Sequence, residues 1–140
     1  RAVKDLKARG FIFELVLAEN LDNPARKEVY KSFEVFVDQL YAGWFGGLAL
    51  ECTVLGKPTL TYLRGSDLQY LWKQMVLDKP VVSATAATLE SKLEAVLAMG
   101  RPELCERTKR SGSFVEKWHD PGKIVGMIIE DIHHFRAQGS

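Results

Sequence analysis

Residues 43–58, GWFGGLALECTVLGKP, decide how this chain is expected to fold. The stretch opens with glycines at 43, 46 and 47, continues as an apolar run and reaches Gly56 just before Pro58. Glycine after an apolar run is a common helix end, and a proline beyond it cannot continue the helix. The pattern predicts a glycine-rich loop, a helix over about 47–55 and a strand that begins after Pro58.

Glu51 is the one charged residue of this apolar run. The residues around it, from 48 to 55, are apolar on nearly every side, which is typical of a helix buried on all faces. A carboxylate in such a place costs several kcal/mol, in order of magnitude, unless it is hydrogen-bonded. The sequence therefore predicts a polar partner for Glu51.

The glycine-rich loop indicates what that partner is. Glycines let a backbone approach a ligand closely, and the N–H groups that open a helix bind anions. An anion at the helix start, with a hydroxyl-rich group beside Glu51 one turn further in, describes the phosphate and ribose of a nucleotide. Two structural alternatives stay open. Glycine-rich turns precede helices in many α/β proteins, and a buried glutamate can be satisfied by a lysine or by backbone amides.

Short strands are predicted on both sides of this helix, at 35–37 and 59–63. Strand, loop, helix and strand at this spacing predict a βαβ unit with parallel strands. Ligands of such sheets bind beyond the carboxyl ends of the strands, which is where the loop 38–47 is expected. The topology thus indicates the same loop as the glycines do.

The rest of the chain is predicted to alternate between helices and strands. The apolar run FIFELVL at 11–17 favours a strand covered on both faces, and residues 80–82 favour a last short strand. This alternation predicts an α/β fold, a parallel sheet flanked by helices. Caps and periodicity place helices up to Gly10, from the cap Asn23 to Phe33, over 66–78, from Thr85 or Thr88 to Leu97, from Pro102 to Trp118, and from the cap Asp120 onward.

Two of these helices are predicted to bury an apolar stripe, and the last helix is predicted to carry one. The stripes are Val29, Tyr30 and Phe33 in the second helix, Leu68, Leu71, Trp72 and Met75 in the helix over 66–78, and Ile124, Val125, Ile128, Ile129 and Ile132 in the last helix.

Composition excludes several classes of function. A chain of 140 residues, 46% hydrophobic and 26% charged, is one ordinary globular domain. A net charge of +1 without a basic stripe argues against nucleic acid, and no apolar run is long enough for a membrane span. Cys52 and Cys105 are interpreted as small core residues of a reducing compartment, and no signal peptide is evident, which indicates the cytoplasm.

The histidines and Lys57 are interpreted as structural. His119 lies beside a helix cap, and His133 and His134 are adjacent, so they do not share a helix face. Neither they nor the cysteines have metal-ligand spacing, and no metal is predicted. Lys57 follows the Gly56 stop, where it can meet the last helix carbonyls.

Residues 35–64, VFVDQLYAGWFGGLALECTVLGKPTLTYLR, resemble the donor-binding signature of retaining glycosyltransferases with the GT-B fold (group 1, family four). That family includes glycogen synthase and many bacterial polysaccharide enzymes. Phe45-Gly46, Glu51 and Leu55-Gly56-Lys57-Pro58 carry the resemblance, and residues 88–97 and 116–132 resemble its closing helices more loosely. The resemblance implies that residues 1–140 are the nucleotide-sugar-binding C-terminal domain, a Rossmann-like half of a GT-B architecture.

The resemblance also implies roles by position. The glutamate that matches Glu51 holds the ribose of a UDP-, GDP- or ADP-sugar. The backbone around Phe45, Gly46, Gly47 and Leu48 meets its diphosphate. The implied reaction transfers the sugar to an acceptor hydroxyl with retention, in glycan or polysaccharide biosynthesis, and needs no cofactor and no obligatory metal.

The chain departs from the family at Gly43, where the family has a first glutamate that contacts the donor sugar. Because Gly43 has no carboxylate at this sugar-proximal position, the catalytic residues stay unassigned. The family's phosphate-clamping Arg and Lys, and its N-terminal acceptor domain, would precede Arg1. Residues 1–10 read as the second half of a helix, so we expect a fragment whose partner is that acceptor domain and which is inactive alone. Many relatives act on lipid-linked acceptors, so peripheral membrane association stays open.

Two alternatives remain. A sugar-nucleotide epimerase of the same fold also has a glutamate-rich helix, a Gly-x-Pro strand and an arginine like Arg64, but the acidic and arginine cluster of those enzymes does not follow Arg64 here. A non-catalytic nucleotide-sugar-binding or assembly module could equally have kept the fold without a glutamate at position 43.

Overall fold

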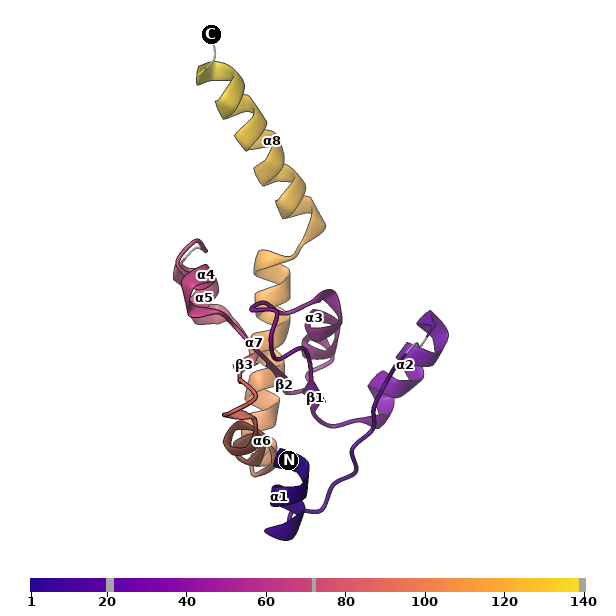
Figure 1. The fold of residues 1–140 in the computed structure, drawn as a ribbon. Coiled ribbons are helices and arrows are strands. Elements are labelled where there is room, and N and C mark those ends of the chain that lie inside the picture. The colour runs from indigo at the N-terminus through magenta and orange to yellow at the C-terminus, as the bar shows by residue number, and fades with distance from the viewer. Residues whose placement is uncertain (20–21, 72, 139–140) are drawn as a thin grey trace.

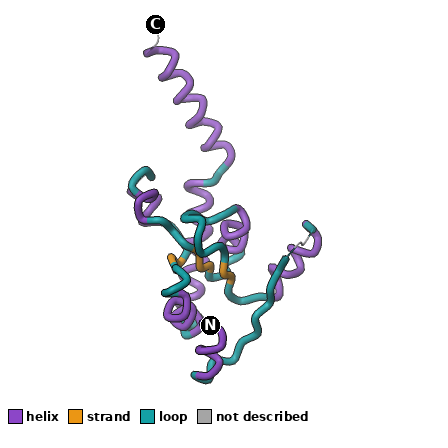
Figure 2. The backbone as a smooth tube through the Cα atoms, viewed as in Figure 1, coloured by secondary structure: helices purple, strands orange, loops and turns teal. Residues whose placement is uncertain are grey.

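A computed structural model describes residues 1–19, 22–71 and 73–138. Within these ranges a parallel sheet of three short strands lies at the centre (Figure 2), in the order β1 (Phe36–Val37), β2 (Thr59–Thr61), β3 (Val82–Ser83). Phe36 aligns with Thr59, and Leu60 aligns with Val82. The prediction of a mixed α/β fold with helices around a parallel sheet is confirmed in this coarse form.

Helices account for most of the described chain (Figure 1), and most of their bounds fall where caps and periodicity place them. Figure 1 also shows that α2 lies apart from the sheet and that α8 extends away from it toward the C-terminus. The helices are α1 (Ala2–Ala8), α2 (Asn23–Ser32), α3 (Gly47–Val54), α4 (Gly65–Leu68), α5 (Lys73–Asp78), α6 (Leu89–Leu97), α7 (Arg101–Trp118) and α8 (Pro121–Gln138).

The core consists of two clusters. Leu60 of β2 packs with Leu6 of α1 and with Leu93 and Val96 of α6, and Leu60 is fully buried. The second cluster joins the loop before α3 to α7 through Phe45, Ala49, Leu63, Val81 and Phe114. Because all three residues of β2 are buried, this strand is the centre of the packing.

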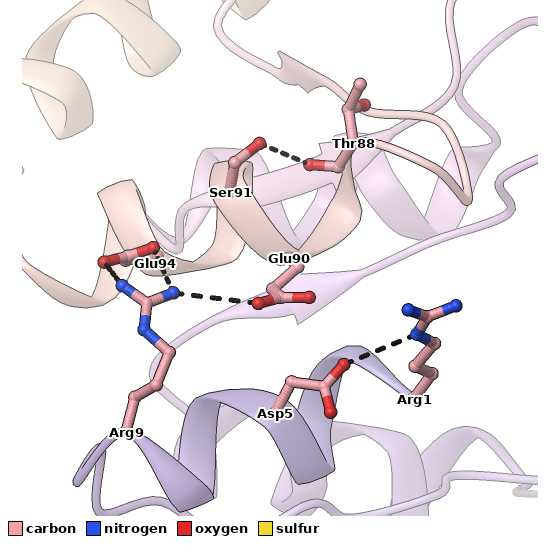
Figure 3. A network of polar contacts seen from close by, with 7 residues as sticks. All are labelled: Arg1, Asp5, Arg9, Thr88, Glu90, Ser91 and Glu94. Carbon is pink, nitrogen blue, oxygen red and sulfur yellow. Dashed lines mark hydrogen bonds and ion pairs between the residues drawn. The ribbon is translucent and has the colours of Figure 1, made fainter.

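Ion pairs join α1 to α6 at the edge of the first cluster (Figure 3). Arg9, which ends α1, donates to both carboxylate oxygens of Glu94 and lies 3.7 Å from a carboxylate oxygen of Glu90. These side chains are partly exposed, so the pairs orient α1 more than they stabilise it, and buried Leu6 supplies the larger share.

The end of α3 lies against α7. Gly56 has φ +75°, the left-handed conformation of a helix-ending glycine, and the N–H groups of Gly56 and Lys57 donate to the carbonyls of Thr53 and Cys52. A Cβ atom at Gly56 would lie 2.6 Å from Thr108 of α7. The predicted Gly56 stop is confirmed, and it also lets the two helices touch.

The prediction of a strand at 11–17 is wrong. Residues 11–17 are extended but form no strand within the described residues, and the exposed fractions of Ile12 and Leu15 are 101% and 62%. Phe11 and Phe13 pack against the first core cluster, so half of the apolar pattern is used. A strand needs a neighbour to complete its hydrogen bonds, and the described sheet supplies none to this segment.

The apolar stripe of α8 is not buried within the described chain. The helix does begin as predicted, since the Lys123 N–H donates to Asp120 Oδ1 at 2.8 Å. Its direction away from the sheet explains the exposure, because no described element covers the stripe (Figure 1). Ile124, Val125, Ile128, Ile129 and Ile132 are between 39% and 54% exposed.

Smaller corrections concern the predicted helices. Asp22, not Asn23, caps α2, because its extended backbone lets Oδ1 accept the Ala25 N–H at 2.9 Å. The single helix predicted over 66–78 is divided into α4 and α5. The N–H groups of Tyr70 and Leu71 bond three residues back, which tightens and ends the first turn. Trp72, a predicted core residue, lies outside the described residues.

The two cysteines differ. Cys52 is fully buried, as predicted, and burial raises the pKa of its thiol to about 12, so it stays protonated and inert. Cys105 is exposed, which contradicts its interpretation as a core residue. The reason is that α7 buries a stripe through Ser111 and Phe114, and Cys105 lies off that stripe.

Candidate functional site

The loop 38–47 follows β1 and leads into α3, at the carboxyl end of the sheet. Gln39 ties it to the end of β2, because the Gln39 carbonyl accepts the Tyr62 N–H at 3.1 Å and the Thr61 hydroxyl at 3.2 Å. The Gln39 side chain donates to the Trp44 carbonyl at 2.9 Å. The loop therefore has a defined shape at the edge where ligands of parallel sheets bind.

Phe45 anchors this loop in the core. Only 6% of the residue is exposed, and its ring stacks on Trp44 with centroids 4.3 Å apart. Phe114 and His119 meet the same ring edge-on, each at 6.4 Å. The side chain of Phe45 is thus a structural anchor, and only its backbone is available to a ligand.

The start of α3 has the features of an anion site. Gly46 is the N-cap residue, and no side chain of the described residues caps the helix. Because no described side chain caps the helix, the N–H groups of Gly47 and Leu48 can donate to a ligand or to water. The helix dipole favours negative charge at this end. The Gly46 N–H is already used, because it donates to Asp38 Oδ2 at 3.3 Å. Of the predicted phosphate-binding amides, those of Gly47 and Leu48 are the better placed.

Glu51 is exposed, which contradicts the prediction of a helix buried on all faces. Only one face of α3 meets the body of the protein, and it buries Ala49, Cys52 and Thr53. The apolar residues on the other side, Val54 and Leu55, are 45% and 53% exposed. Apolarity around the whole helix therefore does not produce burial around the whole helix.

Among the described residues, Tyr30 of α2 contacts Glu51, and its hydroxyl donates to Glu51 Oε2 at 2.8 Å. A tyrosine hydroxyl is thus a described partner of Glu51, which neither of the two structural alternatives, a lysine or a backbone amide, had anticipated. The contact joins residues 21 positions apart, so no local sequence pattern predicts it. An accessible carboxylate one turn into the helix is suited to accept hydrogen bonds from the hydroxyls of a ligand.

Gly43 is buried and has φ +93°, a conformation that other residues adopt only with strain. Its carbonyl accepts the Arg64 N–H at 2.8 Å. A Cβ atom at this position would lie 3.0 to 3.2 Å from three atoms of the Arg64 side chain. Arg64 thus fills the space into which a side chain at position 43 would point.

Arg64 lies at the candidate site, although the sequence did not lead us to predict it as a site residue. Its guanidinium lies 3.2 Å from Asp67 Oδ2, and its second terminal nitrogen donates to the Ala42 carbonyl at 3.4 Å. The signal that could have found it is topological, because Arg64 follows β2 and so ends at the same sheet edge as the loop. The result is a cation beside the glycine-rich loop.

Lys57 makes a structural contact, as predicted, while the interpretation of His119 as structural stays a prediction. Burial lowers the pKa of His119, and its Nε2 has no hydrogen-bond partner among the described residues. Contrary to expectation, the Lys57 side chain does not meet the last carbonyls of α3, because its Nζ donates to the carbonyl of Phe33, the residue that ends α2, at 2.7 Å. No three His, Cys, Asp or Glu side chains of the described ranges gather as a metal site would require.

The chain matches no family model, and comparison with curated proteins and with solved structures likewise finds no match. No helix in the described part of the chain has the length and apolarity needed to cross a membrane.

Proposed function

We propose that the loop 38–47 and α3 bind a nucleotide sugar, and that the chain is the donor-binding part of a retaining glycosyltransferase with the GT-B fold. One observation carries the proposal. In a parallel strand, loop, helix, strand unit, a helix start without a side-chain cap is followed one turn later by the accessible carboxylate of Glu51. Phosphate and ribose of one nucleotide fit these two groups together.

The geometry of the site supports one proposed role for each group. The amides of Gly47 and Leu48 would bind the diphosphate, and Glu51 would accept hydrogen bonds from the ribose hydroxyls. During transfer to an acceptor hydroxyl, negative charge develops on the departing diphosphate. The dipole of α3 and the guanidinium of Arg64 are the described groups that can stabilise it. The acceptor-binding domain and a cytoplasmic site of action at a membrane-linked acceptor belong to the same proposal.

A second function, binding without transfer, is favoured by Gly43. The positive φ of Gly43 disfavours any side chain there, and Arg64 fills the space into which the sugar-contacting glutamate of the family this chain resembles would point. A module with this arrangement could hold a nucleotide sugar without reacting it. Release of nucleoside diphosphate from a bound donor, measured with the acceptor domain present, separates the two functions.

The test is a calorimetric titration of UDP, GDP and ADP, each also as a glucose conjugate, against this chain and its Glu51→Gln variant. We expect one nucleotide to bind and the variant to bind it about tenfold to a hundredfold more weakly, since a hydrogen bond to a charged group is lost. Glu106→Gln, at an exposed position on α7, is the matched control and should bind like the parent chain. Equal affinity in the Glu51→Gln variant, or no binding at millimolar nucleotide, would contradict the proposal.

A further inference from the structure

Tyr30 of α2 contacts the proposed ribose-binding group, Glu51. In Figure 1 this helix lies apart from the sheet, yet the Tyr30 hydroxyl donates to Glu51 Oε2 at 2.8 Å. A hydrogen bond of this length to a carboxylate is of the strong, charge-assisted kind. The contact therefore fixes one oxygen of Glu51 relative to α2.

The Tyr30 ring packs on Phe33, which is itself held by contacts to β1 and to Lys57. The ring meets Phe33 edge-on with centroids 6.3 Å apart, and Phe33 lies 5.7 Å from Phe36 of β1. Lys57, which follows α3, donates to the Phe33 carbonyl at 2.7 Å and lies over the Phe33 ring. Through Phe33, the position of the tyrosine hydroxyl is therefore fixed relative to the sheet and to the end of α3, as well as relative to its own helix.

An exposed glutamate on a helix ordinarily samples several rotamers, and a ligand that needs one of them must oppose that entropy. The Tyr30 hydrogen bond selects one orientation beforehand. It occupies one of about four acceptor positions of a carboxylate, which leaves Oε1 and the second lone pair of Oε2 for the two hydroxyls of a ribose. A side chain fixed in this way is pre-organised for binding.

We infer that Tyr30 is a positioning residue, which holds the Glu51 carboxylate in the orientation that binds the 2′ and 3′ hydroxyls of the nucleotide. This inference rests on the proposed function. It assigns to α2 the discrimination between ribose and 2′-deoxyribose, because a fixed carboxylate gains more from the second hydroxyl than a mobile one does.

The experiment compares UDP with 2′-deoxy-UDP, or the corresponding pair for whichever base binds, in the parent chain, Tyr30→Phe, Glu51→Gln and the double variant. Phenylalanine keeps the ring and its packing and removes only the hydroxyl. We expect Tyr30→Phe to weaken the ribonucleotide about three- to tenfold and the deoxynucleotide less, so that the affinity ratio between them narrows. Because Tyr30 acts through Glu51, the double variant should be no weaker than Glu51→Gln alone.

Tyr70→Phe is the matched control, since Tyr70 is 84% exposed, and its two affinities should equal those of the parent chain. Circular dichroism melting of Tyr30→Phe verifies that the fold is kept. If Glu51→Gln weakens binding while Tyr30→Phe leaves both affinities unchanged, or lowers both equally, the inference is overturned and the proposed function stands. If the parent binds no nucleotide, or Glu51→Gln has no effect, the proposed function fails and the inference falls with it.

Discussion

Residues 59–61 and residues 11–17 both belong to runs of β-branched, aromatic and aliphatic side chains, and both read as strands. In the structure only the first is one. All three residues of β2 are buried between β1 and β3, whereas Ile12 and Leu15 of the second run are largely exposed. The difference teaches that composition permits a strand, while neighbours on both sides and helices on both faces produce it. The effects of equivalent substitutions on stability can therefore be compared between the central strand β2 and the peripheral residues 11–17.

Leucine to alanine substitutions give the largest expected difference between the two regions. Leu60 of β2 is fully buried, so Leu60→Ala should lower the free energy of unfolding by about 2 to 5 kcal/mol. Leu15→Ala removes a side chain that is 62% exposed and should change it by no more than about 0.5 kcal/mol. Urea denaturation of both variants measures the pair. Similar losses would break the comparison, because they would show that residues 11–17 are buried in solution.

Substitution of two glycines with positive φ, one near each region, should give a difference in stability of intermediate size. Gly10 has φ +92° and open space around its missing Cβ, while Gly43 has φ +93° and Arg64 within 3.2 Å. Gly10→Ala should cost about 1 kcal/mol, from backbone strain alone. Gly43→Ala adds overpacking and should cost about 2 to 3 kcal/mol. Denaturation curves measure both, and equal costs would mean that Arg64 moves aside freely.

The smallest expected effect concerns histidine and pH. Burial lowers the pKa of His119 below its ordinary value of about 6.5, so the unfolded chain takes up a proton more readily than the folded one. The stability that His119 supports is present above about pH 6.5 and is lost as the pH falls through its folded pKa. His119→Gln should therefore lose less stability than the parent chain between pH 7.5 and 5.5.

Denaturation at those two pH values, with His133→Gln on the exposed surface of α8 as a control for removing an imidazole, tests this expectation. The effect is small because His119 is only partly buried. A pH dependence in His119→Gln equal to that of the parent would show that another group is responsible.

Local signals in the sequence predicted most helix bounds, since such signals act over a few residues. The Asp120 cap, the proline at 102 and the Gly56 stop all mark helix bounds that the structure has. Burial was predicted less well, because it depends on which elements pack together. Nothing in the apolar pattern of α8 says that its stripe lacks a neighbour within the described chain.

The candidate site divides in the same way. The loop 38–47, the helix start and the topology that places them at a sheet edge could be predicted from glycine spacing and from strand order. The exposure of Glu51 and its bond to Tyr30 could not, because they depend on where α2 lies. The Arg64 side chain over Gly43 likewise joins two segments that only the folded chain brings together.

The contact between Gly56 and α7 has a consequence for how the sequence can vary. A side chain at position 56 would collide with Thr108 at 2.6 Å, and the positive φ there already disfavours it. The Thr108 hydroxyl in turn lies 3.4 Å from the Gly56 carbonyl oxygen, across 52 residues of sequence. A substitution at either position alters the fit of the other, so we expect tolerated changes at one of them to depend on the residue at the other.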